Sequence, residues 1–349
     1  MKNMMITGGC GFIGSNFIRY MLKESDFTGR IINVDKLTYA GNPENLTDIE
    51  DDFKDRYVFT KADICDATKI AEIFEVYKID SVCNFAAESH VDRSIVKPDA
   101  FIQTNIVGTF NLLESARSRL SGMVRFHHIS TDEVYGSLGR EGYFTETTPY
   151  RPNSPYSASK ASSDHLVRAY HKTYGLPMTI SNCSNNYGPY QFPEKLIPLI
   201  ILNALEGKPL PIYGDGRNVR DWLYVRDHCT AIWTIMKNGK TGETHNIGGD
   251  SEMENIAIVK MICDVLDEIN KLSDGRSRRD LITFVKDRPG HDRRYAIDFT
   301  KLNEELNWYP ETSLKTGIRD TIQWYMENQE WVARVESGEY LSWMKEQYG

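Results

Sequence analysis

The chain has 349 residues, of which 40% are hydrophobic and 26% charged, and its formal net charge is −8 at pH 7. This length is enough to bury a large core in one or two domains of a globular protein. The acidic balance argues against a general nucleic-acid binder, which would carry a basic face, but it does not exclude an anionic small-molecule ligand.

Six cysteines occur, none in a C-x-x-C pair, and Cys10, Cys83 and Cys183 lie in or beside apolar runs. We therefore predict buried free thiols and no metal site. No secretory run precedes the first apolar segment, and the most apolar stretch, residues 196–205, is too short to span a bilayer. These features predict a cytoplasmic protein that has neither a membrane nor a nucleic acid as partner.

The N-terminal half alternates strand-like and helix-like segments. Strand-like runs occur at residues 4–7, 31–35, 58–59, 81–85, 124–130 and 178–183, and helical spacing occurs at 12–22, 101–116 and 157–174. Such alternation predicts an α/β fold with a Rossmann-type, doubly wound parallel sheet.

After about residue 185 the alternation weakens and prolines and glycines become frequent. We predict a Rossmann domain over residues 1–184 and a smaller α/β domain over 185–349, some segments of which return to the first sheet. Helices are expected near 256–270 and 314–326. The basic cluster at 276–279 is interpreted as a solvated loop.

A glycine motif joins the first strand to the first helix. Gly8, Gly11 and Gly14 form G-x-x-G-x-x-G, which allows a tight turn, close approach of backbone to a pyrophosphate, and close packing of helix on strand. Asp35 ends the second strand, where a carboxylate accepts hydrogen bonds from ribose hydroxyls and repels a 2′-phosphate, which favours NAD over NADP. The neighbouring Lys36 weakens that preference. Asp63 follows the third strand and is either an adenine ligand or an ordinary surface residue.

Tyr156 and Lys160 form a Y-x-x-x-K pair at the start of a predicted helix. Residues four apart on a helix have Cβ atoms about 6 Å apart, so an ammonium there would lower the pKa of the phenol. Tyr57 and Lys61 have the same spacing but lie in a strand-like run, where they would be about 13 Å apart. We predict a catalytic role for the first pair and a structural role for the second.

Thr131, Asp132 and Glu133 follow the fifth strand. Hydroxyl and carboxylate residues at this position are typical either of a helix cap with an acidic first turn or of acid–base chemistry. The local sequence leaves both interpretations open, and the downstream Tyr156–Lys160 pair favours catalysis.

Several longer motifs extend along the chain. They are found at residues 35–41, 86–94, 129–136, 156–160, 182–189, 220–225 and 287–292. With these motifs the chain resembles the dTDP-glucose 4,6-dehydratase family, within the NAD-dependent epimerase/dehydratase group of the extended short-chain dehydrogenases/reductases.

The resemblance implies a role for each residue of the catalytic group. Tyr156, supported by Lys160, would take the O4 proton of the glucose unit as C4 is oxidised, and Thr131 would hydrogen-bond O4. Glu133 would remove the C5 proton and Asp132 would protonate the leaving C6 hydroxyl, which requires the two carboxyl groups to have different pKa values. NAD would be regenerated in every cycle and stay bound.

The resemblance also implies two sets of binding residues. The NAD contacts would be Gly8, Gly11, Phe12, Ile13, Gly14, Asp35, Lys36, Leu37, Thr38, Asp63, Ile64, Phe85, Ala86, Ala87, Thr104, Tyr156, Lys160 and Asn186. The dTDP-glucose contacts would be Ser89, Thr131, Asn185, Lys195, Leu196, Pro211, Tyr213, Arg220, Asn255, Asp287, Arg288, His291 and Tyr348. Arg220 and Arg288 also suit a pyrophosphate, because guanidinium groups bind such anions in bidentate geometry.

Relatives use the helices equivalent to 101–116 and 157–174 as a four-helix dimer interface, so we expect a homodimer; plain core burial is the alternative. Other candidate functions are a UDP-sugar 4-epimerase, a dehydratase for another nucleotide-sugar, and an NAD-sensing regulatory protein. Epimerases usually have small or hydroxyl residues at the positions of Asp132 and Glu133, so the dehydratase interpretation depends on this pair. Thymidine and uridine differ by one methyl group, which a pocket discriminates by about 10–200-fold.

Overall fold

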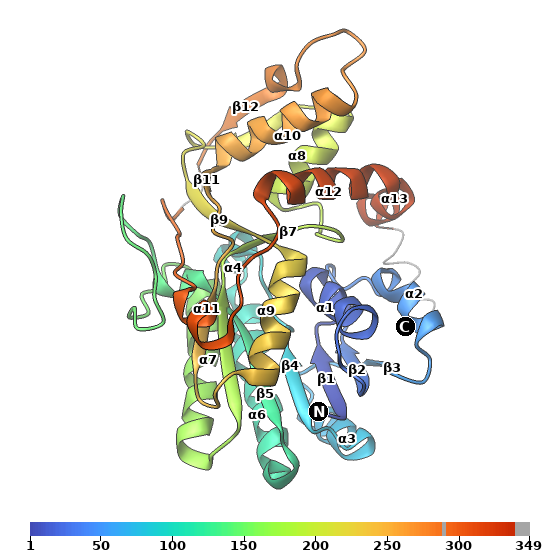
Figure 1. Cartoon of the computed structure of the whole chain (residues 1–349), viewed down its shortest axis with the longest axis vertical. Coiled ribbons are helices and arrows are strands. Elements are labelled where there is room, and N and C mark those ends of the chain that lie inside the picture. The colour runs from blue at the N-terminus through green and yellow to red at the C-terminus, as the bar shows by residue number, and fades with distance from the viewer. Residues whose placement is uncertain (288–290, 339–349) are drawn as a thin grey trace.

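The computed structural model describes residues 1–287 and 291–338 of the chain. A parallel sheet with helices on both faces forms the larger part, and a smaller lobe of helices and short strands lies beyond the carboxyl end of that sheet (Figure 1). The predicted α/β, Rossmann-type fold is confirmed.

The central sheet has seven strands in the order β10-β6-β5-β4-β1-β2-β3, and every neighbouring pair is parallel. β10 comes from the C-terminal half, so part of that half joins the first sheet. The strand bounds are β1 Asn3–Thr7, β2 Arg30–Asp35, β3 Tyr57–Lys61, β4 Ser81–Asn84, β5 Arg125–Thr131, β6 Met178–Cys183 and β10 Thr244–Ile247.

Helices cover the two faces of this sheet. α1 (Phe12–Lys23) and α9 (Val225–Asn238) pack together on one face, and α3 (Ala67–Tyr77), α6 (Thr109–Ser118) and α7 (Pro155–Tyr174) cover the other. Successive strand residues feed opposite faces, as the pleat requires: Met4 belongs to the core under α1 and Met5 to the core under α3 and α6.

The expected single helix over 101–116 is interrupted. α5 (Pro98–Phe101) leads into a π-helical segment, Ile102–Gly108, before α6 begins. Asn105 in this segment accepts a hydrogen bond from Glu88 N at 2.9 Å and donates to Glu88 O at 3.0 Å, so the widened turn is tied to the chain after β4. π-segments of this kind are often found at functional sites, and this one carries Thr104.

Within the described residues, the smaller lobe contains two short sheets and four α-helices. Its core is continuous with the α1/α9 face of the large sheet. The sheets are β11-β9-β7 and β12-β8. The bounds are β7 Asn185–Tyr187, β8 Leu210–Tyr213, β9 Val219–Tyr224, β11 Glu252–Glu254, β12 Ile282–Val285, α8 Leu196–Leu205, α10 Asn255–Ile269, α12 Leu314–Glu327 and α13 Gln329–Ser337.

Shorter elements complete the described chain. They are the helices α2 Thr47–Asp52, α4 Val91–Val96 and α11 Thr300–Leu306, and the 3₁₀ turns Pro43–Leu46, Leu120–Gly122, Asp132–Tyr135 and Arg278–Leu281.

The basic cluster at 276–279 is not simply a solvated loop. Arg278 is 2% exposed, forms a 2.8 Å ion pair with Asp267 and donates to Ala204 O at 2.9 Å. Arg276 and Arg279 do stay at the surface, paired with acidic neighbours. The prediction was wrong for Arg278 because its partners lie on α8 and α10, which the local sequence does not reveal.

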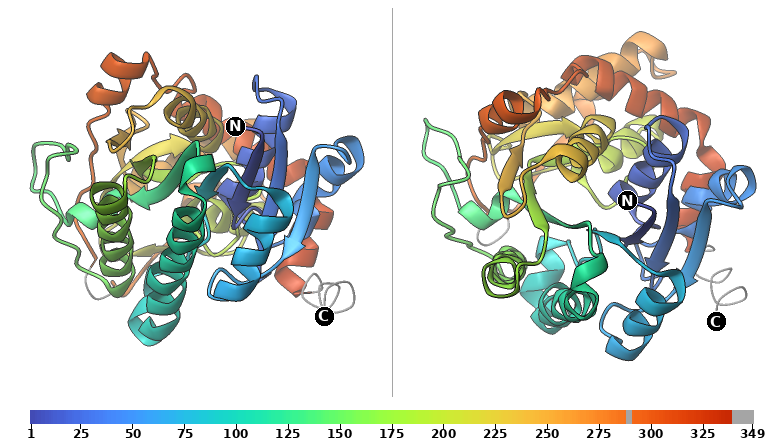
Figure 2. Two further views of the ribbon diagram at one scale, coloured as in Figure 1. Left: turned by 90° about the horizontal axis from the view of Figure 1, so that it is seen from below. Right: turned by 60° about the horizontal axis from the view of Figure 1, so that its bottom comes forward.

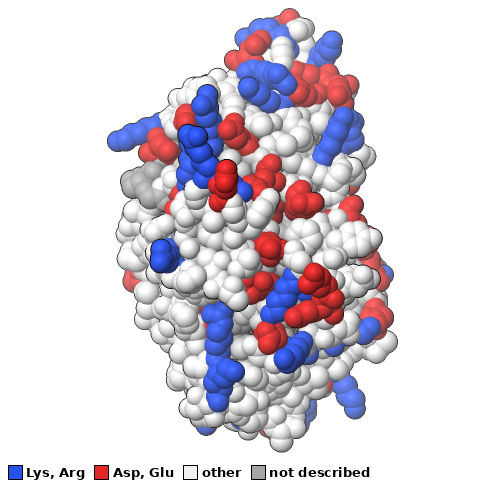
Figure 3. All heavy atoms as spheres, turned by 60° about the vertical axis from the view of Figure 1, so that its left-hand side comes forward, with Lys and Arg blue, Asp and Glu red and all other residues white. Residues whose placement is uncertain are grey.

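Cys10, Cys83 and Cys183 are buried free thiols, as predicted. None of the helices within the described ranges is both long and apolar enough to cross a membrane. On the face shown in Figure 3, basic and acidic side chains are interspersed.

Candidate active site

The glycine motif forms a tight turn between β1 and α1. Gly8 has φ of +68°, and a Cβ placed on it would lie 2.7 Å from Ala86 N. A Cβ on Gly14 would lie 2.3 Å from Gly8 O. α1 begins after Gly11 without a side-chain cap, which leaves N–H groups of its first turn for an anion. The loop thus fits the pyrophosphate of a dinucleotide.

Asp35 lies at the end of β2 and is 8% exposed. Its carboxylate accepts a hydrogen bond from Cys10 N at 3.0 Å, which ties it to the glycine loop, and another from Leu37 N at 2.8 Å. Burial raises the pKa of Asp35, although these two backbone donors oppose the shift. Lys36 pairs instead with Asp63, with Nζ 3.4 Å from Oδ2. The carboxylate is therefore fixed beside the glycine turn.

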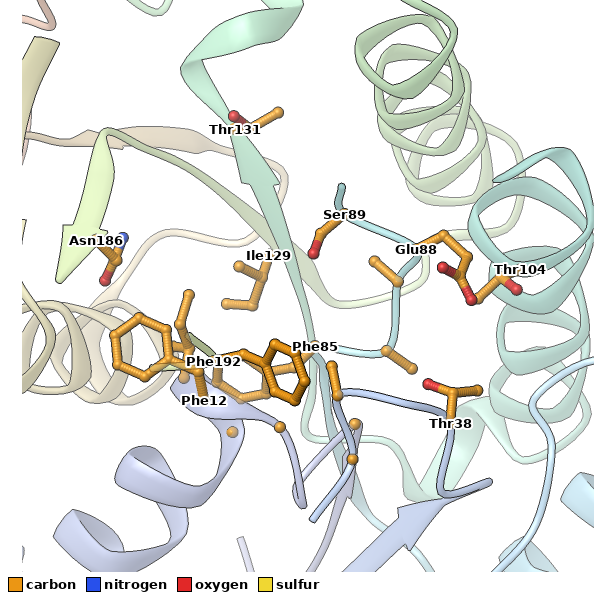
Figure 4. Close-up of a pocket in the computed structure, with 18 of the residues that line it drawn as sticks. Phe12, Thr38, Phe85, Glu88, Ser89, Thr104, Ile129, Thr131, Asn186 and Phe192 are labelled. Carbon is orange, nitrogen blue, oxygen red and sulfur yellow. The ribbon is translucent and has the colours of Figure 1, made fainter. Parts of the chain in front are cut away.

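One pocket of about 340 Å³ follows the carboxyl edge of the large sheet, a size typical of ligand sites. Figure 4 shows Thr131 at the end of β5, with Asn186 on one side and Thr38 and Thr104 on the other. All residues predicted to bind NAD line this pocket except Leu37. Leu37 has φ of +59° and a buried side chain, so it contributes its N–H to Asp35 rather than a pocket surface.

Tyr156 and Lys160 both lie in the pocket on α7, one helical turn apart. Lys160 Nζ donates to Ile129 O at 2.6 Å. Burial raises the pKa of Tyr156 well above its ordinary value, and Glu133 adds to the shift, while Thr131 hydrogen-bonds the phenol and opposes it. The expected lowering of the Tyr156 pKa by Lys160 is therefore not seen in this state, because burial dominates.

Thr131, Asp132 and Glu133 sit where β5 turns into a short 3₁₀ helix, and all three line the pocket. Thr131 Oγ1 accepts a hydrogen bond from Glu133 N at 3.3 Å, so the cap interpretation holds as well. Asp132 is 2% exposed, and burial, reinforced by Glu133, raises its pKa well above the ordinary value. Glu133 is only partly buried. The two adjacent carboxyl groups thus occupy different environments.

The side chain of Asn186 is positioned by a hydrogen bond with a buried histidine. His228 is buried and its Nδ1 lies 2.8 Å from Asn186 Oδ1, while Asn186 Nδ2 donates to Ser184 O at 3.0 Å. Burial lowers the pKa of His228 to about 3, so the ring is neutral and donates from Nδ1.

The residues predicted to bind the nucleotide-sugar divide into two groups. Ser89, Thr131, Asn185 and Lys195 line the pocket. Seven others lie in the smaller lobe and do not line it, namely Leu196, Pro211, Tyr213, Arg220, Asn255, Asp287 and His291. Arg288 and Tyr348 lie outside the described residues.

Within the lobe, two clusters carry most of this second group. His291 Nδ1 lies 2.6 Å from Asp287 Oδ1, and its ring centroid lies 6.4 Å from that of Tyr213. Arg220 is 4% exposed, donates to Asp292 O at 2.9 Å and stacks 4.3 Å over the Tyr295 ring. The positive charge of Arg220 acts on a pocket residue, because it lowers the pKa of Asp132 and so opposes the effect of burial.

One group of residues that line or flank the pocket was not predicted from the sequence. Glu194 accepts hydrogen bonds from Tyr39 Oη at 3.0 Å and from Arg93 at 3.3 Å, and Arg93 lies 3.6 Å over the Tyr39 ring. Phe192 packs edge-on against Tyr39. Tyr39 and Arg93 stand inside two of the quoted motifs, but nothing in the sequence indicated that they meet Glu194.

Comparison with known proteins gives consistent results. The model of the GDP-mannose 4,6 dehydratase family matches residues 5–321. The dTDP-glucose 4,6-dehydratase of Salmonella typhimurium is 57% identical over 99% of this chain and 98% of its own.

Solved structures of dTDP-glucose 4,6-dehydratases are similar to this chain over nearly its whole length. The crystal structure of dTDP-glucose 4,6-dehydratase from Bacillus anthracis in complex with NAD is 46% identical, with a TM-score of 0.86 over 96% of this chain and 100% of that one. The enzyme from Streptomyces venezuelae, solved with NAD and dTDP bound, is 44% identical, with a TM-score of 0.86 over 94% and 98% of the two chains. This chain therefore belongs to the dTDP-glucose 4,6-dehydratase family of NAD-dependent enzymes.

Proposed function

We propose that this chain converts dTDP-glucose to dTDP-4-keto-6-deoxyglucose in the pocket at the carboxyl edge of its large sheet. The observation that carries the proposal is the juxtaposition of two unlike carboxyl groups, Asp132 and Glu133, with Tyr156 and Lys160. Family membership supports the substrate, and the glycine turn with Asp35 supports NAD, which accepts hydride from C4 and returns it to C6 when bound.

In the first step the residues around O4 move one proton. Tyr156 takes the O4 proton as the C4–H bond breaks. Thr131, which already hydrogen-bonds the phenol, also hydrogen-bonds O4. Because burial disfavours the phenolate, the Lys160 ammonium one helical turn away supplies the opposite charge that makes the tyrosine a usable base.

In the second step the carboxyl pair eliminates water. A 4-ketone acidifies the C5 proton, and the partly exposed Glu133 removes it. Asp132, whose pKa is raised by burial, donates its proton to the departing C6 hydroxyl. Two adjacent carboxyl groups can act as a separate acid and base only if their environments differ. Glu133 then returns its proton to C5, while Tyr156 releases the O4 proton and Asp132 regains one by exchange with solvent, which restores the starting protonation.

For the nucleotide-sugar, we propose that Lys195, Asn185 and Ser89 contact it at the pocket, and that the clusters around Arg220 and His291 contact it from the lobe. Thr131 and Ser89 would then face the sugar, while Tyr213, Asn255, Pro211 and Leu196 surround the base and pyrophosphate. Arg220 suits a pyrophosphate because its guanidinium is buried, fixed and charged.

We also propose a homodimer formed through α6 and α7, which lie side by side on one face of the molecule (Figure 2). Ile102, Phe110 and Tyr174 on or before these helices are exposed apolar side chains. Light scattering on the purified protein measures its oligomeric state directly. A cytoplasmic location is proposed because all six cysteines are free, as in a reducing compartment.

The test is to incubate the purified chain with dTDP-glucose and UDP-glucose in separate reactions and to record mass spectra of the products. Loss of one water from dTDP-glucose, much faster than from UDP-glucose, is expected. Conversion to a chromatographically distinct isomer of unchanged mass would indicate epimerisation, and recovery of both sugars unchanged would indicate a binding or sensing protein.

A further inference from the structure

A buried carboxylate lies directly behind the Tyr156–Lys160 pair. Tyr156, Lys160 and Asp164 follow one another at four-residue intervals in α7 and therefore share one face of the helix. Asp164 is completely buried and does not line the pocket. It touches neither ligand in the mechanism proposed above, so its position needs another explanation.

The contacts of Asp164 join α7 to the end of β5. Ser130 Oγ donates to Asp164 Oδ2 at 2.8 Å, and Tyr150 Oη donates to the same oxygen at 2.9 Å. The other oxygen, Oδ1, lies 3.4 Å from His128 Nε2 and has no hydrogen-bond partner within the described residues. The carboxylate is therefore fixed in place by two donors on one oxygen and has His128 beside the other.

His128 does not supply the missing positive charge. Asn84 Nδ2 faces His128 Nδ1 at 3.1 Å, because Asn84 Oδ1 accepts a hydrogen bond from Thr7. The histidine therefore carries its proton on Nε2, and burial lowers its pKa to about 4, which keeps the ring neutral.

Two cations on α7 remain as counter-charges, Lys160 one turn before Asp164 and Arg168 one turn after it. Arg168 donates to Tyr150 Oη at 2.7 Å and to Thr244 Oγ1 at 3.1 Å. Lys160 is 5% exposed, and its ammonium donates to the neutral Ile129 O. A buried ammonium without a nearby anion is costly, and Asp164, one helical turn along α7, is a buried carboxylate whose charge acts on Lys160.

The directions of the pKa shifts agree with this pairing. Burial lowers the pKa of Lys160, and the Asp164 carboxylate opposes that effect. Burial would raise the pKa of Asp164, but His128, Lys160 and Ser130 together hold it below its ordinary value.

We propose that Asp164 is a positioning residue that keeps the Lys160 ammonium charged within the protein and, through it, sets the proton affinity of Tyr156. The proposal rests on the dehydratase function above, in which Tyr156 exchanges a proton with O4. Because Ser130 directly precedes Thr131, the same carboxylate also fixes the strand end that carries the acidic pair. The titratable and charged groups around Lys160 and Asp164 are His128 from β5, Tyr135 and Tyr150 from the chain after β5, Arg168 from α7 and Cys183 from β6.

The first test measures the coupling without using activity. Lys160→Met, Asp164→Asn and the double variant are compared by thermal unfolding of the full chain. Lys160→Met leaves a buried carboxylate without its counter-charge, so adding Asp164→Asn should restore part of the lost melting temperature. Equal lowering of the melting temperature by Asp164→Asn in both backgrounds would overturn the proposal.

The second test uses the pH profile of kcat/KM. Removing the negative charge lowers the pKa of Lys160, so the alkaline limb of Asp164→Asn should move to lower pH by about one unit or more. Tyr150→Phe is the matched control, because it removes a hydrogen bond to the same carboxylate oxygen and leaves both charges. Asp164→Glu should restore much of the original profile.

The outcomes separate the two proposals. An unchanged alkaline limb in Asp164→Asn, or an equal shift in Tyr150→Phe, would show that Asp164 only supports the fold. If wild-type protein dehydrates no sugar, the dehydratase proposal fails while the unfolding cycle still decides whether Lys160 and Asp164 are coupled. If Asp164→Asn alone does not fold, recovery of a folded Lys160→Met/Asp164→Asn protein supports the pairing, and failure of that double variant as well contradicts it.

Discussion

The cofactor half and the nucleotide half of the site are built in different ways. The cofactor half consists of turns that follow strands of one parallel sheet, and the residues predicted for it line a single pocket, apart from Leu37. Most residues proposed for the nucleotide half are spread over the smaller lobe, where Tyr213 and His291 form one cluster and Arg220 belongs to another. A parallel sheet places its strand ends at one edge automatically, whereas the lobe depends on long-range packing.

The difference implies that substitutions should act most strongly where the two halves meet, at the end of β5. Glu133→Gln should lower the rate of dehydration by about 10²–10⁴-fold, the usual contribution of a general base. Oxidation at C4 should persist, because Tyr156 and Lys160 remain. Product mass and absorbance of the reduced cofactor, measured in a single turnover, separate the two steps.

Glu141→Gln is the control, since Glu141 is exposed in a loop away from the pocket and should leave both steps unchanged. Equal loss of C4 oxidation and elimination in Glu133→Gln would contradict the assigned role of Glu133.

Asp132→Asn should slow elimination by about 10²-fold and change its pH dependence. Burial, with Glu133, raises the pKa of Asp132, so the acid form is present at low pH and elimination declines as pH rises through that raised value. The asparagine variant should lack this decline. A pH profile that keeps the same limb would mean that another group is the acid.

Asp132→Asn should slow the reaction but make the folded protein more stable at neutral pH. A carboxyl whose pKa is raised on folding stabilises the protein below its unfolded pKa, about 3.9, and this contribution is lost as pH rises through the folded pKa. At neutral pH Asp132→Asn should therefore unfold at a higher temperature than wild type. Thermal unfolding across pH checks this, and a less stable variant at neutral pH would contradict it.

Within the cofactor half, alanine substitutions at Gly14 and Gly11 should have different effects, one on stability and the other on NAD binding. Gly14→Ala should lower the free energy of unfolding by about 1–3 kcal/mol, because its Cβ would lie 2.3 Å from Gly8 O and the backbone would have to move. Gly11→Ala meets only Gly8 O at 3.3 Å, so it should fold nearly normally and instead retain less NAD. Denaturant titration and the cofactor content of the purified proteins measure the two effects; equal stability loss in both variants would contradict the distinction.

The same contrast explains which features can be predicted from the sequence. Gly8 and Asp35 were predictable because a strand-turn-helix motif fixes their surroundings within a few residues. The contacts of Glu194 with Tyr39 and of Arg278 with Asp267 were not, because their partners come from other elements or are brought close only by the packing of helices. The pKa of Tyr156 was missed for a related reason: the i,i+4 spacing reveals Lys160 but not the degree of burial.

The smallest effect is expected in the lobe, at Tyr213. Its side chain is 47% exposed and edge-on to His291, so it is an adaptable contact rather than part of a preformed pocket. Tyr213→Phe should raise KM for dTDP-glucose by about tenfold at most, the value of one hydrogen bond, and leave kcat and NAD content unchanged. Tyr309→Phe, an exposed tyrosine elsewhere, should change nothing. If Tyr213→Phe lowered kcat as strongly as it raised KM, the lobe would have to organise the reacting groups, and the two halves would not be separable in the way that their construction indicates.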